Sequence, residues 1–416
     1  MSTERFFSDE GMEFATRCVL SGVRHGMAEV GEVLVATETI RDGDATSWVD
    51  TYVTLGRRLL GTAQRASAEG HRYSAWNSAL RAANYLFAGL WWAPATSRAV
   101  DEPGLWDDHR AAWDLAVAHW PSHAEQVAVP SGGTTLPGVW FAPAHEGDLS
   151  GVTVVLLQGL HTPISDGCMT GLDGALARGA RVLMIEGPGQ GAALRRQGLL
   201  LGRDGTRVVD AAVEWLRARP EVDPSRIVVS GVNHGAYLAL SGVLRSGLVP
   251  GGAGIAALVL DPGALDLGGA ARDAVRDAGD DPAQLALLEG TTTGPTGAAS
   301  LQAALALLDS CRIDPEELAG LCVPVLVVEA EDATTFAEQS ATLVAALGER
   351  AHVVRLRHAE GAGADCGLDA SQIHDAAVAD LLPELLGTAS PYPAEPTDGS
   401  PRFPRPTPVH EHGAIR

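Results

Sequence analysis

The chain has 416 residues, of which 46% are hydrophobic and 20% charged, so at roughly 150 residues per domain it is long enough for two or three packed domains. Thirty basic against 52 acidic side chains leave a net charge of −22, which argues against nucleic acid or an anionic membrane surface as a partner. Five irregularly spaced cysteines, no signal-like start and no membrane-length apolar run favour a cytoplasmic protein without a disulfide framework or zinc site.

Residues 1–122 are predicted to form a helical domain. Apolar residues recur at three- and four-residue spacing through residues 48–60 and again through residues 80–90, which is the pattern of amphipathic helices. Asp44 or Ser47 is a suitable N-cap for the first of these two helices. We therefore expect a layer of packed helices before any strand.

Residues 123–387 are predicted to form an α/β core, because short apolar runs without polar alternation are typical of parallel strands buried on both faces. Helical segments between these runs indicate a doubly wound, mostly parallel sheet that begins with a β-hairpin. A helical insertion is expected near residues 270–310, and the Pro-rich residues 388–416 are expected to be disordered. The expected strands are 126–130, 136–141, 152–157, 181–185, 227–230, 257–260 and 325–328, and helices are expected at 206–217 and 236–245.

A buried strand runs directly into Gly231-Val232-Asn233-His234-Gly235 and then into a helix. Small residues two positions before and after a central residue allow the strained turn of a nucleophile elbow, which presents the central side chain at the end of the sheet. The position of this motif between a strand and a helix makes it the most informative segment of the chain.

With this elbow, the chain resembles the α/β-hydrolase superfamily, and within it the branch with an N-terminal helical domain. That branch contains 2,6-dihydroxypseudooxynicotine hydrolase, FrsA-type esterases and fungal polyketide-shortening hydrolases. The resemblance extends over about residues 13–386. It also rests on Arg81-Ala82-Ala83-Asn84-Tyr85, on Pro188-Gly189-Gln190-Gly191 after the second core strand, on the segment from Arg219 to Ile227, and on Asp261-Pro262-Gly263.

The resemblance implies a Ser–His–Asp triad, but this sequence differs from it at all three positions. Asn233 stands where the family has its nucleophilic serine, and Asp365 stands where the late histidine is expected. The family's spacing places Ala333 at the acid position, with Asp332 one residue earlier. Because a triad needs an activated hydroxyl and an imidazole, ordinary serine hydrolysis is not expected.

Four residues around the elbow are candidates for the remaining chemistry. Asn233 can donate its amide to a carbonyl or a developing oxyanion, unless it is only a relic of the lost serine. The backbone N–H groups of His234 and of Leu160 or His161 are expected to form an oxyanion hole. His161 is an acid–base candidate because imidazole titrates near neutrality; the alternative is a solvated loop histidine without a catalytic role.

Further candidates come from carboxylates and from the helical domain. Asp365 or Glu360 could replace the missing imidazole as a base if an apolar pocket raises its pKa; the alternative is a surface carboxylate. We expect contacts with substrate from His234, Asp332, Glu360, Trp76 and Arg81, although the tryptophans of the helical region fit a packing role better.

Three functions remain open. The first is a cofactor-free enzyme that cyclises, rearranges, eliminates or cleaves C–C bonds in a polyketide-like metabolite. The second is a hydrolase in which a carboxylate activates water, and the third is a ligand-binding protein without catalysis. The sequence predicts a small-molecule substrate and neither a cofactor nor a metal, and the resemblance makes a homodimer plausible.

Overall fold

The computed structural model describes residues 5–160, 162–202, 205–246 and 254–387. Its centre is an eight-stranded sheet with the order β1-β2-β4-β3-β5-β6-β7-β8. Strands β3 to β8 run parallel, β2 pairs antiparallel with β4, and β1 pairs antiparallel with β2. The doubly wound, mostly parallel sheet expected from the sequence is thus confirmed. The strands are β1 (His123–Ser131), β2 (Thr134–Ala142), β3 (Thr153–Leu157), β4 (Arg181–Ile185), β5 (Ile227–Val232), β6 (Ala257–Asp261), β7 (Val325–Ala330) and β8 (Ala351–Leu356).

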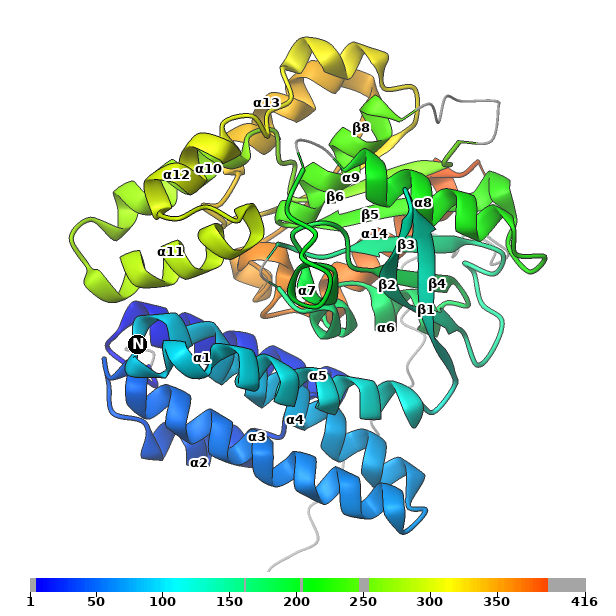
Figure 1. Ribbon diagram of the computed structural model, residues 1–416. Helices are drawn as coiled ribbons and strands as arrows, with labels where there is room; N and C mark the ends of the chain where they lie inside the picture. The colour runs from blue at the N-terminus through cyan, green and yellow to red at the C-terminus, as the bar shows by residue number, and fades with distance from the viewer. Residues whose placement is uncertain (1–4, 161, 203–204, 247–253, 388–416) are drawn as a thin grey trace, which may run out of the picture.

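Helices lie on both faces of the sheet, and the first five form a separate layer, seen in blue and cyan below the core in Figure 1. These five are α1 (Glu10–Ser21), α2 (Val30–Thr39), α3 (Ala45–Ala68), α4 (Arg72–Trp92) and α5 (Glu102–Ala118). The core helices are α6 (Leu172–Ala177), α7 (Gly191–Arg195), α8 (Thr206–Arg217), α9 (His234–Arg245), α10 (Leu267–Ala278), α11 (Pro282–Thr296), α12 (Leu301–Leu308), α13 (Ala337–Leu347) and α14 (Ser371–Leu385).

The buried strands serve two separate hydrophobic cores. Val154 and Leu156 of β3 belong to the core shared with α14 and the helical layer, whereas Val155 and Leu157 belong to the core shared with α8 and α9. Because side chains alternate between two covered faces, the run shows no alternation of apolar and polar residues, and even Thr153 is buried. The domain boundaries at 122 and 387 stay predictions, and the tail 388–416 lies outside the described residues.

A buried histidine joins the helical layer to the core. His25, just after α1, places Nδ1 2.7 Å from Asp173 Oδ2 of α6 and Nε2 2.8 Å from Ser371 Oγ of α14. A second contact of this kind is the buried ion pair between Arg110 of α5 and Glu186 after β4, at 2.8 Å. Both contacts satisfy polar groups inside an otherwise apolar interface, so they fix how the two layers meet.

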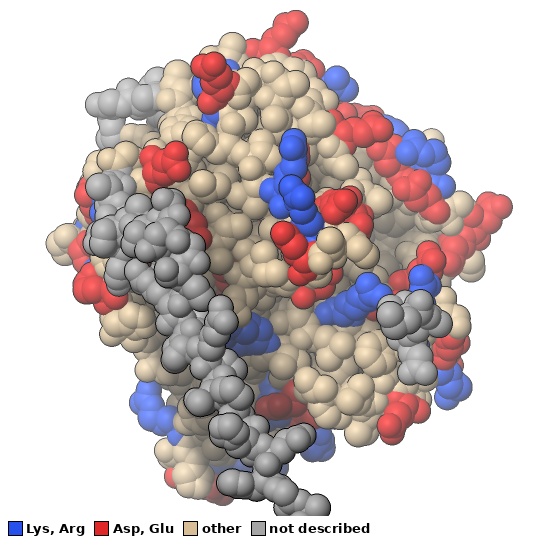
Figure 2. Space-filling view, turned by 180° about the vertical axis from the view of Figure 1, so that it is seen from behind, with Lys and Arg blue, Asp and Glu red and all other residues tan. Residues whose placement is uncertain are grey.

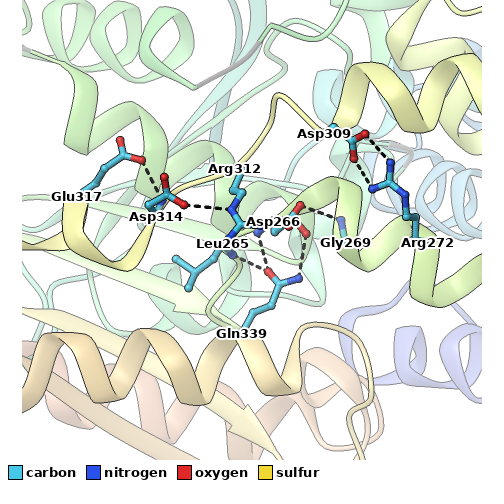
Figure 3. A network of polar contacts seen from close by, with 9 residues as sticks. All are labelled: Leu265, Asp266, Gly269, Arg272, Asp309, Arg312, Asp314, Glu317 and Gln339. Atoms are coloured by element: carbon cyan, nitrogen blue, oxygen red, sulfur yellow. Dashed lines mark hydrogen bonds and ion pairs between the residues drawn. The ribbon is translucent and has the colours of Figure 1, made fainter.

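The segment α10–α12 is anchored to the core by a polar network (Figure 3). The side-chain oxygen of Gln339 accepts hydrogen bonds from the backbone N–H groups of Leu265 and Asp266, at 2.8 and 2.7 Å. Asp266 in turn caps α10 by accepting a hydrogen bond from the N–H of Gly269. The start of this segment is therefore held by a side chain of α13, a helix packed on the sheet.

Charges of both signs are mixed on the surface. On the face shown in Figure 2, the basic side chains stand beside acidic ones. Within the described ranges, no helix combines the length and the apolar character needed to cross a membrane.

We expect His25→Ala to lower the free energy of unfolding by roughly 2–4 kcal/mol, because the buried Ser371 hydroxyl and the Asp173 carboxylate both lose a partner. Denaturant unfolding would measure the change. His71, whose side chain is 64% exposed, is the matched control, and His71→Ala should cost less than about 0.5 kcal/mol. Equal and small costs for the two variants would contradict a joining role for His25.

Candidate functional site

The turn between β5 and α9 has the backbone geometry of a nucleophile elbow. Asn233 lies at φ 54° and ψ −125°, a strained combination for a residue with a side chain. A Cβ atom on Gly231 would lie 2.3 Å from the carbonyl oxygen of Gly235, and one on Gly235 would lie 2.3 Å from that of Leu157. The N–H of Asn233 donates to the carbonyl of Asp261 at 2.6 Å. The two glycines and this hydrogen bond hold the turn.

The side chain of Asn233 is oriented by its neighbour. The N–H of His234 donates to Asn233 Oδ1 at 2.8 Å, so the oxygen of the amide faces the start of α9 and the Nδ2 group is the donor left for a ligand. The His234 ring packs edge-on against Phe336, with centroids 5.5 Å apart. Burial lowers the pKa of His234 to about 4, which makes its imidazole neutral at pH 7.

The loop after β3 is positioned by Gln190, in the Pro-Gly-Gln-Gly segment. Gln190 Nε2 donates to the carbonyl of Gln158 at 2.5 Å, and its Oε1 accepts from the N–H of Gly187 at 2.6 Å. Leu160, the expected second donor of the oxyanion hole, is buried on this loop. His161, the expected acid–base residue, lies outside the described residues, so its role stays a prediction.

Asp365 lies in the turn that follows β8, next to the elbow. Burial raises the pKa of Asp365 to about 6, and the charge of Asp261 contributes to the rise. Within the described part of the chain, Asp365 Oδ1 is buried without a hydrogen-bond partner. Its neighbour Cys366 contacts the elbow residues directly, because its thiol hydrogen-bonds with the Asn233 backbone and lies 3.5 Å from the carbonyl oxygen of Asp261. The structure therefore brings Asp365 and Asn233 to the same end of the sheet.

Helix α1 of the helical layer carries Cys18. Burial raises the pKa of the Cys18 thiol to about 12, and the charges of Asp166 and Asp365 raise it further in that order, which places all three groups within electrostatic reach. Asp166, in the 3-10 turn Ile164–Cys168, is 9% exposed, and burial raises its pKa to about 7. Sequence reasoning missed Asp166, because a lone aspartate in a loop gives no sign of its burial.

Asp332 and Glu360 lie in the loops that follow β7 and β8. The N–H of Asp332 donates to the carbonyl of Gly363 at 3.0 Å, and its carboxylate contacts His358 Nδ1 at 2.6 Å. Hydrogen bonding to Asp332 raises the pKa of His358, a fully exposed residue. Glu360 is exposed. Both carboxylates are thus exposed, unlike Asp166 and Asp365, and their substrate contacts stay predictions.

Trp76 and Arg81 lie on α4 of the helical layer, where they contact the residue Trp120 that follows α5 and Glu32 of α2. The Trp76 ring packs edge-on against Trp120, with centroids 5.9 Å apart, and Arg81 Nη1 donates to Glu32 Oε1 at 2.6 Å. A packing role for Trp76 agrees with these contacts. In the described ranges, no three histidine, cysteine or carboxylate side chains are grouped to hold a metal ion.

The fold and the elbow define a protein of the α/β-hydrolase fold with an N-terminal helical layer. No protein-family model matches the chain. Among solved structures, 2,6-dihydroxy-pseudo-oxynicotine hydrolase matches with a TM-score of 0.70 at 17% identity, over 90% of this chain and 98% of that one. AbyA5 matches with a TM-score of 0.57 at 14% identity, over 83% and 87% of the two chains.

Among curated sequences, "Hydrolase LUC6" of Fusarium sp is 31% identical over 51% of this chain and 52% of its own length. "20-hydroxy-prefusarin hydrolase FUS2" of Gibberella moniliformis is 29% identical over 57% and 58%. The chain spans about half the length of the curated relatives it matches. The chain thus has the α/β-hydrolase fold with an N-terminal helical layer, and part of its sequence is similar to these curated hydrolases.

Backbone strain at the elbow can be measured with two variants of one residue. Asn233→Ala and Asn233→Gly both remove the contact with the His234 N–H, but only glycine adopts the native φ and ψ without strain. We expect the glycine variant to be more stable than the alanine variant by about 1 kcal/mol, measured by thermal or denaturant unfolding. A less stable glycine variant would rule out strain at this position.

Asp166→Asn should stabilise the fold in a pH-dependent way. A carboxyl whose pKa is raised on folding costs stability as the pH rises from its unfolded pKa towards its folded pKa, here from about 4 to about 7. We expect the gain in unfolding free energy to be larger at pH 8 than at pH 5 by roughly 2 kcal/mol. Asp101→Asn, on an exposed residue, should show no such trend in the same unfolding experiment.

Proposed function

We propose that this protein is a cofactor-independent enzyme that performs a non-hydrolytic step on a polyketide-like secondary metabolite. Cyclisation, rearrangement, elimination and C–C cleavage belong to this class, because each can proceed through an enolate or alkoxide without a covalent acyl-enzyme. The observation that carries the proposal is Asp365, a carboxyl with a pKa of about 6, at the position where the family has its triad histidine.

In this mechanism, the Asp365 carboxylate takes a proton from a carbon or hydroxyl of the substrate. A group with a pKa of about 6 is ionised at pH 7 and still basic enough for this transfer. The negative charge then develops on the substrate oxygen, where Asn233 Nδ2 and the N–H of Leu160 donate hydrogen bonds. The neutral Asp365 carboxyl returns the proton later in the reaction. The masses of the products therefore add up to the mass of the substrate.

The substrate class rests on similarity. The curated relatives are named as hydrolases, and FUS2 is named for a hydroxy-prefusarin. A homodimer, expected from the resemblance, also stays a prediction. Hydrolysis by a water that Asp365 activates is the second candidate, and the buried, unpartnered Oδ1 of Asp365 supports it equally. A ligand-binding role without catalysis is the third.

The test incubates the protein with culture extract from the organism that encodes it and follows metabolites by mass spectrometry. We expect one metabolite to be consumed and the masses of its products to add up to its own mass. The rate should rise as the pH increases through about 6. Asp365→Asn and Asn233→Ala should each slow the reaction at least 100-fold. Asp101→Asn, at an exposed carboxylate outside the candidate site, is the control and should leave the rate unchanged.

Each other outcome favours a different function. A product mass increased by one water would overturn the non-hydrolytic step and favour the second candidate. Unchanged activity of Asp365→Asn would remove Asp365 from the mechanism. A metabolite that is retained by the protein but never converted would favour a binding role.

A further inference from the structure

A buried ion pair lies directly behind the elbow, on the face of the sheet covered by α14. His374 Nε2 is 2.8 Å from Asp261 Oδ2, and each side chain is 5% exposed. The other ring nitrogen, Nδ1, lies 3.2 Å from the carboxylate of Asp375, which is 11% exposed. An imidazole between two carboxylates is bonded best as the doubly protonated cation, since both nitrogens then donate.

Asp261 connects this pair to the candidate site. Its carbonyl oxygen accepts the N–H of Asn233 at 2.6 Å and lies 3.5 Å from the Cys366 thiol, while its carboxylate holds His374. The last residue of β6 therefore contacts the elbow with its main chain and α14 with its side chain. Sequence reasoning singled out the Asp-Pro-Gly segment without assigning it a role.

The charge on Asp261 is also felt at Asp365, whose pKa it helps to raise. Although burial opposes a charged imidazole, the Asp261 carboxylate raises the pKa of His374 above its ordinary value, so His374 is a cation at neutral pH. The cation offsets the charge of Asp261. Asp261 is thus faced by His374 from α14 and by Asp365 and Cys366 from the turn after β8, and Asp365 is also faced by Cys18 of α1.

We propose that His374 is a positioning residue that, through Asp261, holds the elbow in place and limits the negative charge felt by Asp365. Its role in a reaction rests on the function proposed above, but the structural and electrostatic role does not. His374 touches no reacting atom in this proposal: it acts on Asn233 through the main chain of Asp261, and on Asp365 through space.

The choice of variant follows from the packing around His374. A cavity of about 40 Å³ lies on this face of the sheet, lined mainly by apolar side chains together with Asp261, His374 and Asp375. Such a volume holds roughly three waters, and His374→Ala would enlarge it beside an unpaired carboxylate. His374→Gln retains a donor for Asp261 and most of the volume while it removes the positive charge.

The test titrates Asp365 directly by ¹³C NMR of its side-chain carboxyl, assigned by the loss of the signal in Asp365→Asn. With the cation removed, we expect the pKa of Asp365 in His374→Gln to rise by about 0.5–1 unit, because the charge of Asp261 is no longer offset. The backbone amide of Asn233 should also exchange with solvent at least tenfold faster, since its acceptor is held less firmly.

His25→Gln is the matched control, because His25 is also a buried histidine bonded to an aspartate and to α14. It should leave both readouts unchanged. An unchanged or lowered pKa of Asp365 in His374→Gln would overturn the electrostatic part of the proposal, and equal shifts in both variants would show a general loosening of α14. Neither readout needs turnover, so a failure of the proposed reaction is distinguished from a failure of this inference.

Discussion

The site depends on one strained turn and on the contacts that hold it. Asn233 adopts a backbone conformation that costs on the order of 1–3 kcal/mol for a residue with a side chain. That cost is sustained because α9 packs so closely on β3 that Gly235 has no room for a Cβ, and because the Asn233 N–H is bonded to the end of β6. Three neighbouring parallel strands thus contribute to a single turn, and the sheet must form before the turn is stable.

The helical layer also helps to hold the segments around the elbow in place. Arg110 pairs with Glu186, two residues before the Pro-Gly-Gln-Gly segment, and Gln190 within that segment donates to the carbonyl of Gln158. Contacts from the helical layer, as well as from the sheet, therefore determine the position of the loop after β3. Removal of one partner from a buried ion pair typically costs 3–5 kcal/mol. The buried pair therefore opposes separation of the helical layer from the core.

The sheet could be predicted because buried parallel strands have a plain signature in the sequence. Arg181–Ile185 and Thr206–Arg217 have the bounds that the apolar pattern indicates. β8 was not predicted: it lies at the edge, with several half-exposed residues and an alternating composition. Within the site, the elbow and Asp365 follow from motif spacing. Asp166 and His374 do not, because burial of a polar side chain depends on what packs over it, and that is decided by segments distant in sequence.

The hydrogen bond between the His234 N–H and Asn233 Oδ1 means that one donor of the expected oxyanion hole is already bonded within the protein. A neutral carbonyl would compete with the amide on nearly equal terms and gain little by replacing it. An oxygen that has acquired negative charge forms a bond roughly twice as strong, so it would displace the amide oxygen readily. In the proposed mechanism, Asn233 Oδ1 would keep this N–H from the uncharged substrate and release it as negative charge develops, which is the differential binding that accelerates a reaction.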